Sequence, residues 1–322
     1  MKVSIVEWNE QDLDAAAQLI YSVFVTGNKD WGTSNSPETV KGYLEELEDA
    51  KSCFVIRAHL EDRLVGFAVL RIEKKTIEMN PTWLGGDPFI SPDVKQEELL
   101  EDLIPEINEW AKDNDLETTI FYRGHDAQKT REYQRVALEQ YQELGFYVRE
   151  KDVFMMFQLA DYEPMDLSLP QGYELVPIRD ADYEAVYSCF YETFSHGQSP
   201  FFFDQSDAER RTYFETWSSP ESIESDATIA VVRGNDVVAF SFARPYGMQG
   251  NYLVEWIGVH PDHRRRGLGK YLMMHVANVA KDGGYDTMSL SCATGNTRAY
   301  ALYTKLGWYD DGGETIMALK LK

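Results

Sequence analysis

A basic stretch with two glycines, residues 264–270, combines the residue types that hold phosphate. Arg264, Gly267 and Gly269 are spaced Arg-x-x-Gly-x-Gly, and three further cations stand among them: Arg265, Arg266 and Lys270. Glycine lets a pyrophosphate approach the backbone closely, and the unpaired N–H groups at the start of a helix attract anions. The spacing predicts a loop that binds a phosphorylated ligand, provided that a strand precedes it and a helix follows it.

The flanking residues supply that context. The pattern predicts a strand over 252–259, a turn at His260 and Pro261, and a helix over 268–281, in which apolar residues recur at helical spacing. An alternative is that the glycines only cap or loosen the helix and that the arginines are solvated. The strand–loop–helix order favours the phosphate-binding interpretation.

The sequence contains one pattern twice. Residues 3–24 and 173–194 each predict a short strand followed by a helix, and 52–72 and 228–244 each predict a hairpin. Residues 137–146 and 299–308 share alanine, tyrosine and glycine at equal spacing, which makes Tyr141 and Tyr303 equivalent. A stretch with two prolines, 161–172, is predicted to be a linker. We therefore expect two copies of one α/β unit with a mixed sheet, over 1–163 and 164–322.

Only the second copy has the basic glycine loop. In the first copy, Lys95, Glu98 and Leu100 stand where the second has Arg264, Gly267 and Gly269. A carboxylate would repel phosphate, and a leucine side chain would prevent its close approach. We expect only the second copy to bind a phosphorylated cofactor.

The composition disfavours several function classes. Against 31 Lys and Arg there are 54 Asp and Glu, a net charge of −23, which argues against nucleic-acid and anionic membrane partners. The three cysteines, Cys53, Cys189 and Cys292, form no CxxC pair, so we expect no disulfide framework and no metal. Few cysteines, no signal-peptide pattern and no apolar run of about 18 residues favour a cytoplasmic protein.

Two segments carry a family resemblance: Val259–Gly269 (VHPDHRRRGLG) and Asn296–Trp308 (NTRAYALYTKLGW). They resemble the GNAT superfamily of acetyl-CoA-dependent N-acetyltransferases, and the resemblance covers roughly 173–322. The whole chain resembles tandem members with a mycothiol-synthase-like arrangement, in which one half keeps the cofactor loop and the other is degenerate. The resemblance implies two tandem GNAT-like folds and acetyl-CoA as co-substrate.

The resemblance also implies roles for particular residues. The strand ending at Ile257 and Val259 would diverge from 287–292 to admit the pantetheine arm, and the Val259 N–H would polarise the thioester carbonyl. Asn296 would bind near the pantetheine, cap the following helix, or both. Tyr303 would protonate the departing thiolate, or would only pack. The pyrophosphate would be held by the backbone of Arg264, Arg265, Arg266, Gly267, Leu268, Gly269 and Lys270.

Direct transfer in a ternary complex needs a neutral amine, and the base is open. Glu255 lies in an apolar run, LVEWIGV, where burial would make a carboxylate a stronger base, although it could instead form a structural ion pair. His196 lies in 195–204, whose phenylalanines could form a wall of the acceptor site or pack in the core. A chain of water molecules is the third route. Cys292 is expected to be a buried structural residue rather than an acyl-carrying nucleophile, because no His–Asp partner motif accompanies it.

The favoured function is acetyl transfer to a primary amine of a small molecule or peptide, and the acidic surface favours a cationic acceptor. One alternative is a non-enzymatic acyl-CoA-binding module, and another is mycothiol-synthase-like acetylation of an aminosugar thiol. The first copy could cap the second, complete its acceptor pocket or mediate a homodimer.

Overall fold

The computed structural model divides the chain into two compact units. Unit 1 consists of Met1–Arg149 with Glu314–Lys322, and unit 2 of Glu150–Gly313. The structure describes residues 1–7, 13–26, 36–45, 53–73, 75–79, 88–126, 138–195, 202, 206–218, 224–246 and 250–321. Within these ranges, no helix is both long and apolar enough to cross a bilayer.

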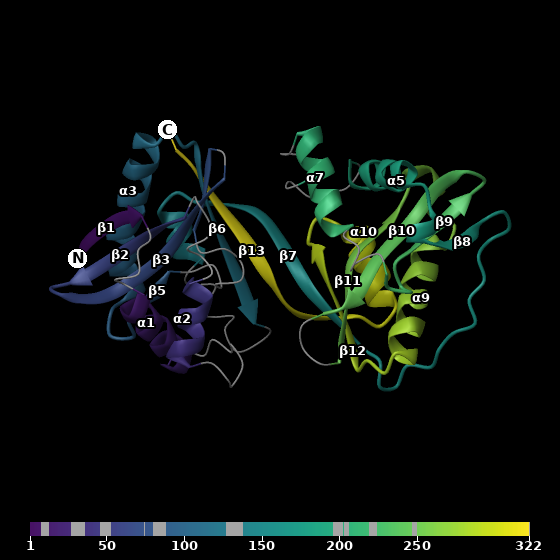
Figure 1. Cartoon of the computed structure of the whole chain (residues 1–322), viewed down its shortest axis with the longest axis horizontal. Coiled ribbons are helices and arrows are strands. Elements are labelled where there is room, and N and C mark those ends of the chain that lie inside the picture. Colours follow the sequence, from purple (N-terminus) through teal and green to yellow (C-terminus); the bar gives the residue numbers. More distant parts are fainter. Residues whose placement is uncertain are drawn as a thin grey trace. The chain divides into compact units, whose positions relative to one another are not determined.

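Unit 1 contains a mixed sheet in the order β1-β2-β3-β4-β6, with β5 paired to β3 outside this path. Neighbouring strands are antiparallel except β4 and β6, which are parallel. The elements (Figure 1) are β1 (Lys2–Glu7), α1 (Leu13–Thr26), α2 (Pro37–Glu45), β2 (Cys53–Leu60), β3 (Arg63–Glu73), β4 (Thr76–Met79), β5 (Phe89–Ile90), α3 (Gln96–Asp113) and β6 (Thr118–Asp126).

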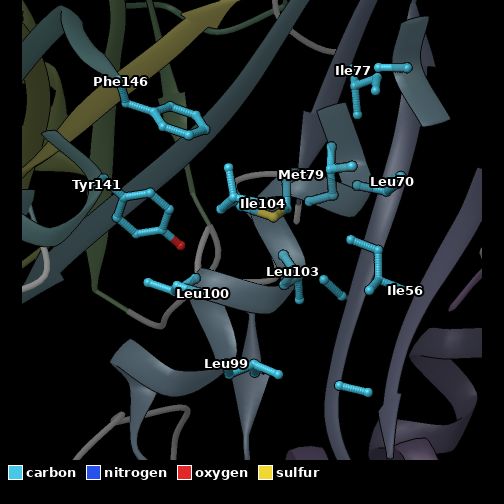
Figure 2. Close-up of a cluster of buried hydrophobic side chains, with 14 of the residues drawn as sticks. Ile56, Leu70, Ile77, Met79, Leu99, Leu100, Leu103, Ile104, Tyr141 and Phe146 are labelled. Carbon is cyan, nitrogen blue, oxygen red and sulfur yellow. The ribbon is translucent and has the colours of Figure 1, made fainter. Parts of the chain in front are cut away.

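Alternating residues of the unit 1 strands form two buried layers. Ile56 and Leu70 face α3 through Leu103, as Figure 2 shows. Their neighbours along the strands, among them Val55 and Val69, pack with α1 and α2. This alternation follows from the two-residue period of a strand, which directs successive side chains to opposite faces.

Unit 2 contains a second mixed sheet, in the order β7-β12-β11-β10-β9-β8, with β11 and β12 parallel and the other neighbours antiparallel. Its elements are most of β7 (Tyr147–Gln158), β8 (Glu174–Pro177), η3 (Ile178–Asp180), α5 (Tyr183–Ser195), α7 (Asp207–Trp217), β9 (Ile229–Arg233), β10 (Asp236–Pro245), β11 (Asn251–Val259), η4 (Pro261–His263), α9 (Leu268–Asp282), β12 (Thr287–Ala293), α10 (Thr297–Lys305) and the first residues of β13 (Tyr309–Lys320), whose remainder from Glu314 belongs to unit 1. Aromatic side chains of α5 pack on one face of the sheet, and α9 packs on the other.

The repeated α/β pattern is confirmed in both units. Both hairpins form, as β2–β3 and β9–β10, and α9 ends one residue beyond the predicted 268–281. The segment 161–172 contains no helix or strand, as expected of a linker.

The two sequence repeats exchange their last strands. Residues 152–158 of β7, which end the first repeat, pair with β12 in unit 2. The end of β13 belongs to unit 1, where Met317 is buried in the core and the Leu321 N–H donates to the Glu117 carbonyl oxygen at 2.9 Å. The predicted division at residues 163 and 164 separates the sequence repeats, whereas each compact unit contains one strand from the other repeat.

Candidate functional site

Strands β11 and β12 diverge along their length, as the family resemblance implied. Their parallel pairing covers only Asn251–Leu253 and Thr287–Ser289. Strand β11 continues to Val259 with β10 as its partner, while β12 continues to Ala293 with β7 as its partner. A gap therefore opens between the second halves of β11 and β12.

The backbone of β11 directs polar groups into this gap. The His260 N–H donates to the Val238 carbonyl oxygen at 2.9 Å, and the register places Gly258 opposite Phe240. Antiparallel pairs alternate between hydrogen-bonded and non-hydrogen-bonded positions. Ile257 and Val259 therefore direct their N–H and C=O groups away from β10, toward β12.

A β-bulge interrupts the pairing of β10 and β11 at Glu255. Phe242 pairs with Trp256 and Ala243 with Val254, so Glu255 is the extra residue of the bulge. A bulge changes the direction of a side chain relative to a regular strand. The bulge thus determines where the Glu255 carboxylate lies.

The two glycines of the basic loop have different physical roles. Gly267 caps α9 in the left-handed conformation, with φ +87°, and a Cβ there would meet nothing within 4 Å. Its absence of a side chain is required by the backbone, not by space. At Gly269 a Cβ would lie 3.2 Å from Cδ2 of Leu302, so this glycine lets α9 and α10 pack closely.

A first cleft, of about 360 Å³, lies around this loop and the gap. Nine of the ten residues predicted to bind cofactor line it, as does Tyr303: Ile257, Val259, Arg264, Arg265, Gly267, Leu268, Gly269, Lys270 and Asn296. Arg266 is not among its lining residues, and its Nη2 donates to the Asp262 carbonyl oxygen at 3.4 Å. Arg298 and His263 also line the cleft; the sequence predicted a contact with phosphate or solvent for His263, which flanks the loop, and no role for Arg298.

Arg264 binds protein backbone, not open solvent. Its Nε donates to the Val259 carbonyl oxygen at 3.1 Å, and its Nη2 to the Thr193 carbonyl oxygen at 3.2 Å. Burial, together with the positive charge of Arg298, lowers the pKa of the Arg264 guanidinium. Arg264 therefore ties the loop to the end of β11 and the end of α5.

The corresponding part of unit 1 is helical instead. Helix α3 begins at Gln96, almost one turn earlier than α9, whose first residue, Leu268, aligns with Leu99. Glu98 lies in this extra turn, with its carboxylate 3.4 Å from the Lys95 ammonium. Leu100 is buried in the same cluster as Tyr141 (Figure 2). A helical turn thus replaces the glycine loop of unit 2.

A second cleft, of about 350 Å³, adjoins the first. Phe194, Ile257, Asn296 and Tyr303 line both clefts. Three carboxylates line the second cleft, from Glu150, Asp152 and Glu255, and none of the described residues around it is Lys, Arg or His. The second cleft is therefore anionic, whereas the first is lined by cations.

Glu255 forms an ion pair and also lines the second cleft. Its side chain is 1% exposed, and Oε1 accepts from Arg244 Nε at 2.9 Å and Nη2 at 2.5 Å. Its other oxygen, Oε2, is buried and accepts no hydrogen bond from the described residues. The ion pair and the location in the cleft therefore coexist, with one oxygen left for a ligand or a water molecule.

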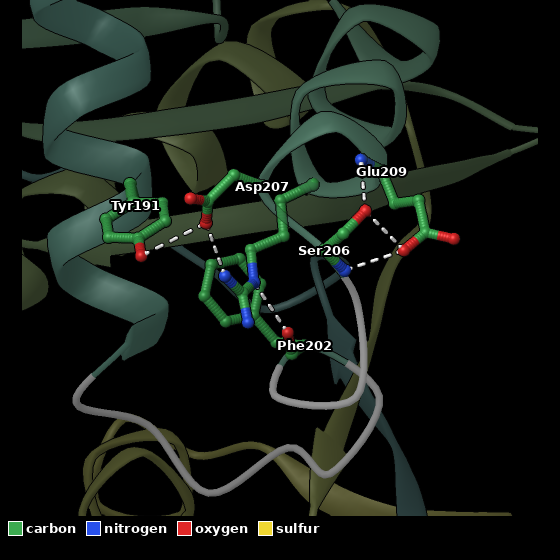
Figure 3. Close-up of polar contacts among 6 residues, drawn as sticks. Tyr191, Phe202, Ser206, Asp207 and Glu209 are labelled. Carbon is green, nitrogen blue, oxygen red and sulfur yellow. Dashed lines mark hydrogen bonds and ion pairs between the residues drawn. The ribbon is translucent and has the colours of Figure 1, made fainter.

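Aromatic residues form the apolar wall of the second cleft: Phe194, Phe202, Tyr213 and Trp256. Figure 3 shows the local support of Phe202, whose carbonyl oxygen accepts from Arg210 Nε at 2.8 Å, while Arg210 Nη1 donates to Asp207 Oδ1 at 2.8 Å. Ser206 and Glu209 form a capping box at the start of α7. The other base candidate, His196, and also Phe201 and Phe203, lie outside the described residues.

Three predicted residues, Ile257, Asn296 and Tyr303, lie where the clefts meet. Tyr303 is 7% exposed, and burial raises the pKa of its hydroxyl. Asn296 caps α10, its Oδ1 accepting from the Ala299 N–H at 3.3 Å, so the predicted cap is confirmed. The described residues contain no group of three His, Cys, Asp or Glu that could hold a metal ion.

Cys292 is buried on β12, and burial raises the pKa of its thiol to about 11. Because the thiolate is the reactive form, we expect iodoacetamide at pH 8 to alkylate Cys292 at least about tenfold more slowly in the folded protein than in the guanidinium-unfolded chain. Mass spectrometry of the Cys292 peptide over time measures both rates. Equal rates would contradict the buried thiol and reopen the acyl-cysteine alternative.

Comparisons with known proteins agree with this geometry. Residues 184–308 match the model of the acetyltransferase (GNAT) family. Streptothricin acetyltransferase from Streptomyces lavendulae is 28% identical over 94 residues, which are 29% of this chain, and the chain spans about half (50%) of that relative.

Two solved structures are similar over the whole chain. A GCN5-related N-acetyltransferase from Sphaerobacter thermophilus has 17% identity and a TM-score of 0.66, with 99% of this chain and 96% of that chain covered. A tandem GNAT protein from the clavulanic acid biosynthesis pathway has 14% identity and a TM-score of 0.64, with 100% of this chain and 99% of that chain covered. Residues 184–308 are thus similar to the acetyltransferase (GNAT) family, and the chain has the fold of tandem GNAT proteins.

Proposed function

We propose that unit 2 transfers an acetyl group from acetyl-CoA to a primary amine of a small molecule or peptide, directly and in a ternary complex. The observation that carries this proposal is the junction of a cationic and an anionic cleft at Ile257, Asn296 and Tyr303. An anionic donor and a cationic acceptor would meet at these residues.

The residues of the first cleft fit acetyl-CoA. The left-handed Gly267 and the first N–H groups of α9 form a cradle for a pyrophosphate, with Arg265, Lys270 and Arg298 as nearby cations. When bound, acetyl-CoA supplies the acetyl group as a thioester. The edge of β11 at Ile257 and Val259 has no neighbouring strand and would pair with an extended pantetheine arm as an added strand does, although the Val259 carbonyl oxygen already accepts from Arg264 Nε. The Val259 N–H would polarise the thioester carbonyl.

Two side chains move the protons of the transfer. As the acceptor nitrogen bonds to the acetyl carbon and the carbon–sulfur bond breaks, the nitrogen loses a proton and the sulfur gains one. Glu255 accepts the proton from nitrogen through Oε2, directly or through water; the support is that this oxygen is buried and unpartnered among the described residues. Tyr303 donates to the sulfur, because it lines both clefts and burial keeps its hydroxyl protonated.

A screen of amines with acetyl-CoA tests the proposal. The purified full chain is incubated with a mixture that includes monoamines, diamines, streptothricin, an aminosugar thiol and basic peptides, and mass spectrometry detects any acetylated product. The expected result is acetylation of at least one primary amine. Calorimetric binding of acetyl-CoA with no acetylated product and no hydrolysis would instead favour the non-enzymatic acyl-CoA-binding module.

A further inference from the structure

The exchanged strand β7 contributes carboxylates to the second cleft. Asp152 is paired with Ala293 in the sheet, and its Oδ2 accepts from the Ser291 hydroxyl at 3.1 Å. Its Oδ1 is buried and has no hydrogen-bond partner in the parts of the chain that the structure describes. Asp152 thus comes from the first sequence repeat but lines the second cleft of unit 2.

A buried carboxylate oxygen without a hydrogen-bond partner lowers the stability of the folded protein. Desolvation disfavours the charged form, and an opposite charge within hydrogen-bond distance restores it. Burial raises the pKa of Asp152, although the hydrogen bond from Ser291 opposes the shift. An ammonium group bound at Oδ1 would remove the desolvation cost, whereas a neutral ligand atom without a donor would not.

The second cleft contains two such oxygens, not one. Glu255 Oε2 is also buried and unpartnered among the described residues, and the ion pair with Arg244 holds only Oε1. Trp256 and Tyr213, whose ring centroids are 5.0 Å apart, supply apolar and π surface beside these carboxylates. This combination suits a chain of methylene groups with a cation at each end.

We propose that Asp152 is a specificity-determining residue, which binds a second ammonium group of the acceptor while the first is acetylated near Glu255. The acceptor class is therefore a small diamine or polyamine. The inference rests on the proposed acetyl transfer for the role of the first amine, but the binding of a dication at Asp152 can be measured without turnover.

Asp152→Asn tests this role, with butylamine and 1,4-diaminobutane as matched probes that differ in one ammonium. For the wild-type protein we expect kcat/KM to be at least tenfold higher for the diamine. In Asp152→Asn we expect the KM for the diamine to rise about tenfold, while kcat/KM for butylamine stays within about twofold. Asp166→Asn, at an exposed position outside both clefts, removes the same charge and is the control.

Calorimetric titration of 1,4-diaminobutane into each protein separates this inference from the proposed function. If the wild type binds the diamine about tenfold more tightly than Asp152→Asn but acetylates no amine, the site stands and the proposed function fails. If butylamine is acetylated as well as the diamine, or if Asp152→Asn affects both amines equally, the site is wrong and the proposed function stands. Asp152→Ser gives the same comparison should the asparagine variant fail to fold.

Discussion

Replacing Gly267 by glutamate is expected to weaken acetyl-CoA binding at least 100-fold, which corresponds to about 2.7 kcal/mol. Two effects add. Gly267 has φ +87°, and a non-glycine residue there costs about 1 kcal/mol or more. The new carboxylate, the residue found at position 98 of the first repeat, also lies at the start of α9, where it repels the pyrophosphate and competes for the same N–H groups. Isothermal titration with acetyl-CoA measures the change.

Gly284 provides a matched control at the other end of α9. It has φ +76°, and a Cβ there would also meet nothing within 4 Å. Gly284→Glu therefore introduces similar backbone strain and the same charge without approaching the first cleft, and we expect unchanged affinity for acetyl-CoA. Gly267→Ala separates the strain at Gly267 from the charge. Wild-type affinity in Gly267→Glu, or equal losses in Gly267→Glu and Gly284→Glu, would contradict the proposed phosphate cradle.

The local features of the site could be predicted from the sequence because each depends on neighbouring residues. The Arg-x-x-Gly-x-Gly spacing indicated the loop and the start of α9 to the residue. The cap at Asn296 was likewise predicted, whereas the divergence of β11 from β12, which are far apart in the sequence, was implied only by the family resemblance. Arg298 was overlooked although it lies within the motif that carried the resemblance.

The strand exchange could not be predicted in the same way. Pairing of residues 152–158 with 287–293 joins segments far apart in the sequence, and alternation within one strand does not identify its partner. Asp152 was missed for this reason. The sequence places it at the end of the first repeat, whereas the sheet places it in the second cleft of unit 2.

Charge alone was also a poor guide to hydrogen bonding. The cations at 264–270 formed one predicted group, but Arg264 donates to two backbone carbonyl oxygens and Arg266 to a third. Which of these cations donate to backbone carbonyl oxygens depends on the three-dimensional structure, not on the sequence spacing. Arg265 and Lys270, together with Arg298, are therefore the better candidates for direct contact with phosphate.

Replacing Tyr303 by phenylalanine is expected to lower kcat about 30- to 100-fold and to leave the Kd for acetyl-CoA within about twofold. The ring remains, and with it the packing against Trp308, whose centroid lies 6.1 Å away. Only the hydroxyl that donates to the departing sulfur is lost. Because burial raises the pKa of Tyr303, its hydroxyl stays protonated across neutral pH, so the loss should be equal from pH 6 to pH 9.

Tyr141→Phe is the matched control for this substitution. Tyr141 occupies the equivalent position in the first repeat, but it is fully buried in the unit 1 core. We expect that removing the Tyr141 hydroxyl leaves kcat and the Kd for acetyl-CoA unchanged, even if the substitution changes the thermal unfolding temperature. Wild-type turnover in Tyr303→Phe at every pH would assign Tyr303 the packing role alone. A loss of kcat confined to Tyr303→Phe would mean that the two equivalent tyrosines differ in function, because only Tyr303 lies where the two clefts meet.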